Sequence, residues 1–100
     1  MLRHMVLFRF RTDADNEGRR VVLDGLAELP ALFPTMRRFG LGENISQRDR
    51  TFTHAMTIEF DSRDQLERYL ASSVHERFVS GTFKPAVEDR VIASYEWNEL

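Results

Sequence analysis

The chain has 100 residues, of which 42% are apolar and 30% are charged, and it contains no cysteine. A chain of this length buries about two-thirds of its unfolded surface, so we expect a single domain over residues 1–100. The lack of cysteine excludes disulfides, thiolate metal ligands and a cysteine nucleophile, and the net charge of −2 does not favour binding to nucleic acid.

The first predicted element is a strand over residues 3–11, where side chains alternate between two faces. His4, Val6, Phe8 and Phe10 share one of these faces. Arginines interrupt the apolar residues here, so the segment lacks the unbroken core of a signal peptide. No run in the chain approaches the roughly 20 apolar residues that span a bilayer. We therefore expect a cytoplasmic protein that does not enter a membrane.

A helix and an irregular strand are predicted next. Aspartates in the polar stretch 12–16 can cap a helix, and apolar residues then recur at helical spacing until Pro30 and Pro34, which we expect to end it. The stretch 37–48 contains two glycines, which pack poorly in the interior of a strand. We therefore expect a bulged or edge strand there.

The second half of the chain begins with another alternating strand, over residues 53–61, which places His54 and Met56 on one face. Ser62 then begins a capping-box signature, which predicts a second helix with Tyr69 on its buried side. The alternation over residues 53–61 has the same pattern as that over residues 3–11.

The last helical segment and the last strand complete the order β-α-β-β-α-β. Ser72 and Ser73 interrupt the second helix, a helical piece with Phe78 as an anchor runs from residue 74 to about 83, and the final strand covers 89–97. This order is the ferredoxin-like α+β pattern, in which one antiparallel sheet carries the helices on a single face. The opposite face needs a cover, so we expect a homodimer.

Four polar aromatic residues are expected to converge in this fold. We expect the first and third strands to lie side by side and parallel, which would place His4 and His54 at the same end, about 5 Å apart. Tyr69 and His75 can point toward that end as well. A histidine can take or give a proton and a phenol can donate a hydrogen bond to a developing enolate, and carbonyl chemistry needs this pair.

The same residues also have structural interpretations. A histidine at the end of a strand is often simply a hydrogen-bonded structural residue, and this applies to His4 and His54. Three histidines can bind zinc, but none of the spacings here is a local ligand motif, so we expect no metal and no other cofactor. Phe83 and Trp97 are typical of core or interface packing.

Several short motifs follow one another along the chain. They are RHMVLFRF at 3–10, GENIS at 42–46, TH at 53–54, FDS at 60–62, the stretch from Tyr69 through His75 to Phe78, and YE at 95–96. Together they resemble the stress-responsive A/B barrel (Dabb) family of the dimeric α/β-barrel superfamily. The resemblance implies a homodimer whose sheets close into a barrel through the faces opposite the helices, lined by Met5, Leu7, Ala55 and Thr57. Arg9 would pair there with an acid such as Glu59 or extend outward.

The resemblance also implies roles for individual residues. The family includes a plant polyketide cyclase, olivetolic acid cyclase, in which a histidine base and a tyrosine promote an aldol condensation. By correspondence, His75 matches the base and Tyr69 the tyrosine, while His4 and His54 match two pocket histidines. Ser72-Ser73 stands where the family commonly has His-Pro.

We therefore expect a small-molecule pocket protein that acts as a cofactor-free cyclase or lyase on polyketide-like or β-keto substrates. His75 would abstract the proton next to a carbonyl and Tyr69 would stabilise the enolate. The substrate would be bound by His4, His54, Val6, Phe8, Met56 and Phe78. Two alternatives stay open, a non-catalytic stress-associated homodimer that binds a small hydrophobic ligand, and a cofactor-independent oxygenase.

Overall fold

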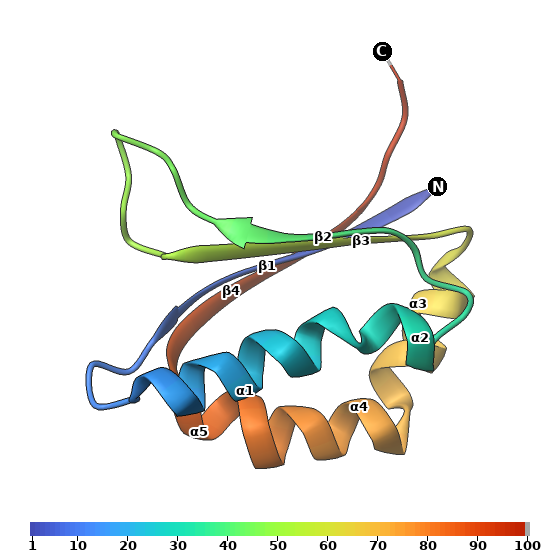
Figure 1. Cartoon of the computed structure of the whole chain (residues 1–100). Coiled ribbons are helices and arrows are strands. Elements are labelled where there is room, and N and C mark those ends of the chain that lie inside the picture. Colours follow the sequence, from blue (N-terminus) through green and yellow to red (C-terminus); the bar gives the residue numbers. More distant parts are fainter. Residues whose placement is uncertain (100) are drawn as a thin grey trace.

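The computed structural model describes residues 1–99 and consists of two layers, a four-stranded sheet and a layer of helices (Figure 1). The strands are β1 (Leu2–Phe10), β2 (Arg37–Glu43), β3 (His54–Phe60) and β4 (Val87–Glu96). The helices are α1 (Asn16–Ala27), α2 (Leu29–Leu32), α3 (Arg63–Ala71), α4 (Ser73–Phe78), the π-helix η1 (Val79–Phe83) and α5 (Lys84–Ala86). Figure 1 shows the helices on one face of the sheet, which confirms the predicted ferredoxin-like α+β class.

The sheet has the strand order β2-β3-β1-β4, and every neighbouring pair is antiparallel. The expectation that the first and third strands are parallel is therefore wrong. The helical crossover after β1 makes β2 run in the same direction as β1. The turn between β2 and β3 then reverses the chain, so β3 is antiparallel to β1. As a result Phe8 pairs with His54, and His4 pairs with Ile58. His4 and His54 lie at opposite ends of the sheet.

The core lies between the sheet and the helices, as the alternation in β1 predicts. Every second residue of β1 is buried, and Phe8, Ile58 and Phe60 have no exposed surface. Val22 and Leu26 of α1 pack onto this face. Full burial of one such side chain contributes roughly 1.5–3 kcal/mol, so this layer supplies most of the stabilisation of the fold.

Local signals set most of the helix boundaries. The side chains of Asp15 and Ser62 accept backbone N–H groups at the starts of α1 and α3, as predicted. Ser72 ends α3 and caps α4, which is the break expected there. Pro30 does not end a helix: α1 stops at Ala27, and the proline stands in the first turn of α2, where its missing N–H is not needed.

Strands β2 and β4 form the two edges of the sheet. The predicted irregularity of β2 is confirmed, because its register shifts between Arg37 and Gly40, and Arg38 has a φ of 43°. Strand β4 pairs along almost the whole of β1, from Leu2 opposite Glu96 onward. The first and last strands of the fold are therefore neighbours.

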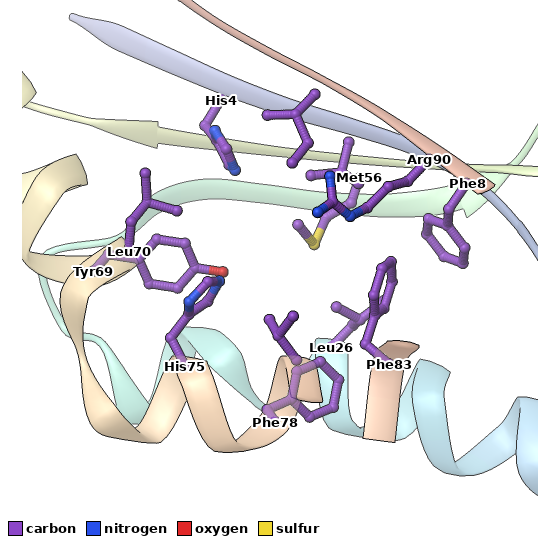
Figure 2. Close-up of a pocket in the computed structure, with 13 residues that line it drawn as sticks. His4, Phe8, Leu26, Met56, Tyr69, Leu70, His75, Phe78, Phe83 and Arg90 are labelled. Carbon is purple, nitrogen blue, oxygen red and sulfur yellow. The ribbon is translucent and has the colours of Figure 1, made fainter. Parts of the chain in front are cut away.

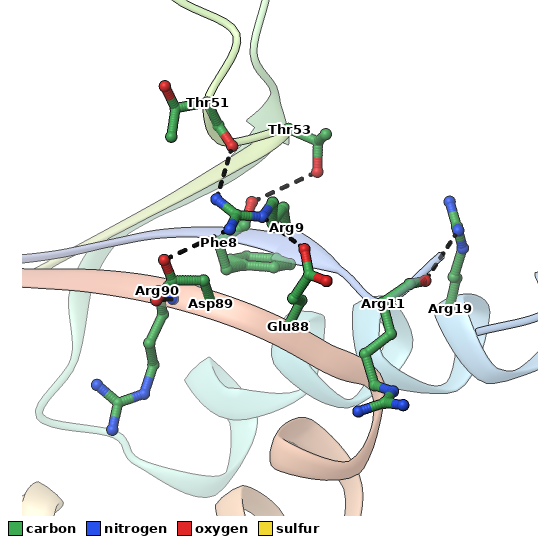
Figure 3. A network of polar contacts seen from close by, with 9 residues as sticks. All are labelled: Phe8, Arg9, Arg11, Arg19, Thr51, Thr53, Glu88, Asp89 and Arg90. Atoms are coloured by element: carbon green, nitrogen blue, oxygen red, sulfur yellow. Dashed lines mark hydrogen bonds and ion pairs between the residues drawn. The ribbon is translucent and has the colours of Figure 1, made fainter. Parts of the chain in front are cut away.

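The sheet face opposite the helices is partly apolar. Leu7 lies between Ala55 and Val91 on this face, and Val91 is 48% exposed. Arg9 does not reach Glu59: its Nε lies 2.8 Å from Oε2 of Glu88 (Figure 3), while Glu59 accepts from Nη2 of Arg3 at 2.7 Å. Among residues 1–99, no helix is long and apolar enough to cross a membrane.

Candidate functional site

A cavity of about 100 Å³ lies between the sheet and the helices α3, α4 and η1 (Figure 2). Four of its lining side chains are polar, namely those of His4, Tyr69, His75 and Arg90, and the others are apolar. No acidic residue is among the described residues that line it. The cavity is therefore a mostly apolar site with a few converging polar groups, which is typical of small-molecule binding.

Seven of the eight residues predicted for the site line this cavity. They are His4, Val6, Phe8, Met56, Tyr69, His75 and Phe78. Their roles in binding or catalysis stay predictions, but their convergence is a property of the fold. They come from three parts of the sequence, residues 4–8, residue 56 and residues 69–78, which the packing of the helices on the sheet brings together.

His54 is the exception, and its expected place in the cluster is corrected. Its ring stacks on Phe8 with 5.3 Å between centroids and meets Phe10 edge-on at the same distance. Its Nδ1 is 2.8 Å from the hydroxyl of Thr53. Because β1 and β3 are antiparallel, Phe8 stands between His54 and the cavity, and His54 serves the packing at the far end of the sheet.

His4 is held by a cross-strand contact. It is only 3% exposed, and its Nδ1 lies 2.7 Å from the hydroxyl of Ser94, its partner on β4. Since Nδ1 is engaged, Nε2 is the nitrogen left to meet a ligand, and Figure 2 shows the ring directed into the cavity. The hydroxyl of Ser94 therefore fixes the orientation of the imidazole.

Tyr69 presents its phenol at the cavity from the buried side of α3. Its ring is 3% exposed and packs against Phe33 and Phe60, with centroids 4.9 and 5.5 Å away. Burial raises the pKa of Tyr69 to about 12. The phenol thus keeps its proton at neutral pH and acts as a hydrogen-bond donor rather than as a base.

His75 stands in the first turns of α4, which the Ser72 cap starts directly after α3. Its ring centroid is 4.5 Å from that of Tyr69. Its Nδ1 is buried and has no hydrogen-bond partner among residues 1–99. Burial lowers the pKa of His75, and the backbone of Leu70 offsets part of this effect. A neutral imidazole with an unpaired buried nitrogen can accept a proton or a polar group of a ligand.

The helices approach each other closely where the cavity wall is formed. Gly25 of α1 faces the ring of Phe78, and a Cβ atom at this position would overlap that ring. The approach lets Phe78 close one side of the cavity, and the π-helix that follows contributes Val79 and Phe83 to the same wall. Phe83, for which we expected core or interface packing, packs on Phe8 and also lines the cavity.

Strand β4 contributes residues that sequence reasoning missed. Arg90 and Ile92 line the cavity, and Ser94 supports His4 from the same face of the strand. Their spacing of two residues is a signal present in the sequence. It becomes informative only with the register of β4 against β1, which the sequence does not provide.

The histidines predict how stability depends on pH. Burial lowers the pKa of His4, of His54 and of His75 below the value of about 6.5 that a histidine has in an unfolded chain, and for His4 the charge of His75 adds to this effect. Between the folded and unfolded pKa values the unfolded chain binds more protons, so the free energy of unfolding rises with pH. We expect full stability above about pH 6.5, and a loss as the pH falls through the folded pKa values.

Urea unfolding at about pH 7.5 and about pH 5 measures this loss, since carboxylates with lowered pKa values, such as Asp13 and Asp49, titrate only at lower pH. The His4→Gln variant removes the most buried imidazole and should show a shallower pH dependence than the wild type. Equal unfolding free energies of the wild type at the two pH values would contradict the prediction.

Within residues 1–99, no group of three or more histidine, cysteine, aspartate or glutamate residues is arranged to hold a metal ion. The polar groups that line the cavity are two imidazoles, a phenol and a guanidinium.

Comparisons with known proteins agree with this fold. The family model described as the stress responsive A/B barrel domain (Dabb) matches residues 2–97. A stress-response A/B barrel domain-containing protein of Arabidopsis thaliana, At5g22580, is 25% identical over 96 residues, covering 93% of this chain and 83% of the relative.

Two solved structures are informative neighbours. The hydroxynitrile lyase from Passiflora edulis is 25% identical with a TM-score of 0.88, and the match covers 99% of this chain and 94% of that one. A dimeric ferredoxin-like protein of unknown function from Bacteroides fragilis is 28% identical with a TM-score of 0.73, covering 96% and 95% of the two chains. Both neighbours match over almost the full length of the domain.

Proposed function

Because the chain belongs to the stress responsive A/B barrel domain family, we propose that it is a small-molecule enzyme that uses acid–base catalysis on carbonyl compounds. The substrates would be β-keto or polyketide-like molecules, and the reaction would begin with formation of an enolate. One observation carries the proposal: the imidazole of His75, with its lowered pKa, lies beside the phenol of Tyr69, with its raised pKa, in one apolar cavity.

The proposed first step is a proton transfer. The neutral imidazole of His75 takes the proton from the carbon next to the carbonyl, so that a C–H bond breaks and an N–H bond forms. The electron pair moves onto the carbonyl oxygen, to which Tyr69 donates its phenolic hydrogen bond. Apolar surroundings strengthen that hydrogen bond because they screen charge less than water does. No cofactor is needed for this step.

The enolate can then react in two ways. Its carbon can attack a second carbonyl, whose oxygen takes up the proton from His75, and this closes a ring in a cyclase. In a lyase, the electron pair of the enolate instead forms a double bond next to the carbonyl and expels from the β-carbon a leaving group, which leaves with the electrons of the broken bond. The neighbouring structure from Passiflora edulis is a hydroxynitrile lyase, which supports placing an enzyme of the lyase class on this fold. His4, held by Ser94, would orient the substrate through Nε2.

A non-catalytic ligand-binding protein is the second candidate, and the packing of Tyr69 favours it. Its ring is fixed between Phe33 and Phe60, so the residue also completes the core. In that case the cavity would hold a small hydrophobic ligand without turnover. A cofactor-independent oxygenase would differ from both candidates by consuming oxygen with quinol-like substrates.

We also propose that the chain forms a homodimer through the sheet face that carries Leu7.

The Tyr69→Phe variant tests the proposed function. The assay is exchange of the α-protons of ethyl benzoylacetate in D2O, followed by NMR against buffer alone. We expect exchange above background in the wild type, and a loss of about tenfold or more in the variant, because one hydrogen bond to the developing oxyanion disappears while the ring stays in the core. Wild-type exchange at the buffer rate would contradict enzymatic enolisation and favour the binding protein.

A further inference from the structure

Arg90 places a positive charge in a cavity that is otherwise neutral and mostly apolar. It stands on β4 opposite Phe8, and its side chain projects to the helix side of the sheet. Figure 2 shows the guanidinium extending into the space above Leu26 and Phe83, on the side of the cavity away from Tyr69 and His75. The mechanism proposed above does not use this group.

Within the part of the chain that the structure describes, the charge of Arg90 has no counterpart. None of the ion pairs formed among residues 1–99 includes it. Its neighbours Glu88 and Asp89 pair instead with Arg9, at 2.8 and 3.6 Å. Figure 3 shows the Arg90 side chain turned away from both acids. Alternation places Asp89 on the other face of the strand, and Glu88 stands where the register of β4 against β1 shifts.

The other polar groups of the cavity do not neutralise it either. No described residue lining the cavity is acidic, and the phenol of Tyr69 stays protonated because its pKa is raised to about 12. The whole chain has a net charge of −2, so a general excess of positive charge does not explain a free cation here. Arg90 is exposed to solvent, so water solvates its charge, and a ligand that displaces this water from the cavity would supply the negative charge itself.

We infer that Arg90 binds a carboxylate of the substrate, and that the substrates are small oxo acids. The inference rests on the proposed function and names its substrate class. A guanidinium offers paired N–H donors that match the two oxygens of a carboxylate.

The position of Arg90 also orders the parts of such a substrate. Ser94, Ile92 and Arg90 follow one another on the same face of β4, with about 6.6 Å between successive members. The carbonyl would bind at the end that holds His4 and His75, an apolar segment would cross Ile92, and the carboxylate would reach Arg90. The carboxylate and the reacting carbonyl are thus separated by several bonds.

Paired ligands test the inference without any turnover. 3-Benzoylpropionate carries a ketone, an apolar ring and a carboxylate, and its methyl ester has the same body without the charge. We expect calorimetric titration of the wild type to give a dissociation constant roughly tenfold lower for the acid than for the ester, a preference that falls as salt rises. The Arg90→Gln variant should lose this preference, while Arg90→Lys should keep part of it.

The control is Arg63→Gln, which removes the same charge from an exposed position on α3 away from the cavity. It should keep the preference of the wild type for the acid. Equal affinities for acid and ester in the wild type would overturn the inference, as would an undiminished preference in Arg90→Gln or a lack of binding of both compounds. Thermal unfolding of each variant shows that the fold is intact.

The two proposals can fail separately. If Arg90→Gln abolishes the preference but proton exchange stays at the buffer rate, the cavity binds oxo acids without enolising them, and only the catalytic proposal falls. If exchange depends on Tyr69 but acid and ester bind equally well, enolisation stands and the carboxylate site falls.

Discussion

The His75→Ala variant exchanges the α-protons of ethyl benzoylacetate about 10²–10⁴ times more slowly than the wild type, the usual contribution of a general base. The imidazole is the group beside Tyr69 that is both neutral at working pH and free to accept a proton, since its Nδ1 has no partner among residues 1–99. Alanine also removes a ring from the cavity wall, so the affinity for 3-benzoylpropionate is measured in parallel. A loss of exchange with retained binding assigns the defect to the chemistry.

The matched control for this variant is His54→Ala. It removes the same kind of ring from β3 instead of α4, at the end of the sheet where His54 stacks on Phe8 outside the cavity. We expect its exchange rate to equal that of the wild type. In the wild type the rate should stay constant down to the ordinary histidine pKa of about 6.5 and fall only at lower pH, because burial lowers the pKa of His75. Equal exchange by His75→Ala and the wild type would refute the role of the base.

The Leu7→Glu variant is expected to be monomeric at concentrations where the wild type is a dimer. Leu7 lies on the sheet face opposite the helices, between Ala55 and Val91, and that face would be buried between two copies. An unpaired carboxylate in such an interface costs several kcal/mol, so the dissociation constant of the dimer should rise by at least roughly 100-fold. Light scattering coupled to size exclusion measures the change.

Val21→Glu is the control for the dimer. Val21 is 47% exposed on α1, in the helix layer on the other side of the molecule, so the same new charge there should leave the oligomeric state unchanged. A wild type that is monomeric at micromolar concentration would contradict the proposed homodimer.

Short-range patterns predicted much of the fold correctly. The alternation in residues 3–11 identified the buried face of β1, because side chains in a strand point to opposite faces in turn. Asp15 and Ser62 marked the starts of α1 and α3, because capping depends on atoms only a few residues apart. The prediction that Pro30 ends the first helix was wrong, because a proline is compatible both with the end of one helix and with the first turn of another.

The candidate site was harder to predict because it depends on strand direction and register. His4, Tyr69 and His75 meet in the cavity as expected, but the antiparallel pairing of β1 with β3 moves His54 to the other end of the sheet. Arg90 was missed for a related reason. From the sequence alone, an arginine in an edge strand is interpreted as solvated surface. Only the register of β4 against β1 shows that Arg90 lies opposite Phe8.

The pairing of β1 with β4 affects how the protein folds during its synthesis on the ribosome. Leu2 precedes its partner Glu96 by almost the whole length of the domain, so it is made much earlier. During synthesis the edge of β1 that pairs with β4 stays uncovered until nearly all of the domain has been made. Until then this edge can pair with other nascent chains. The orientation of His4 by Ser94 is also delayed until that moment. A stalled or shortened chain would thus expose an aggregation-prone edge and lack the organised cavity.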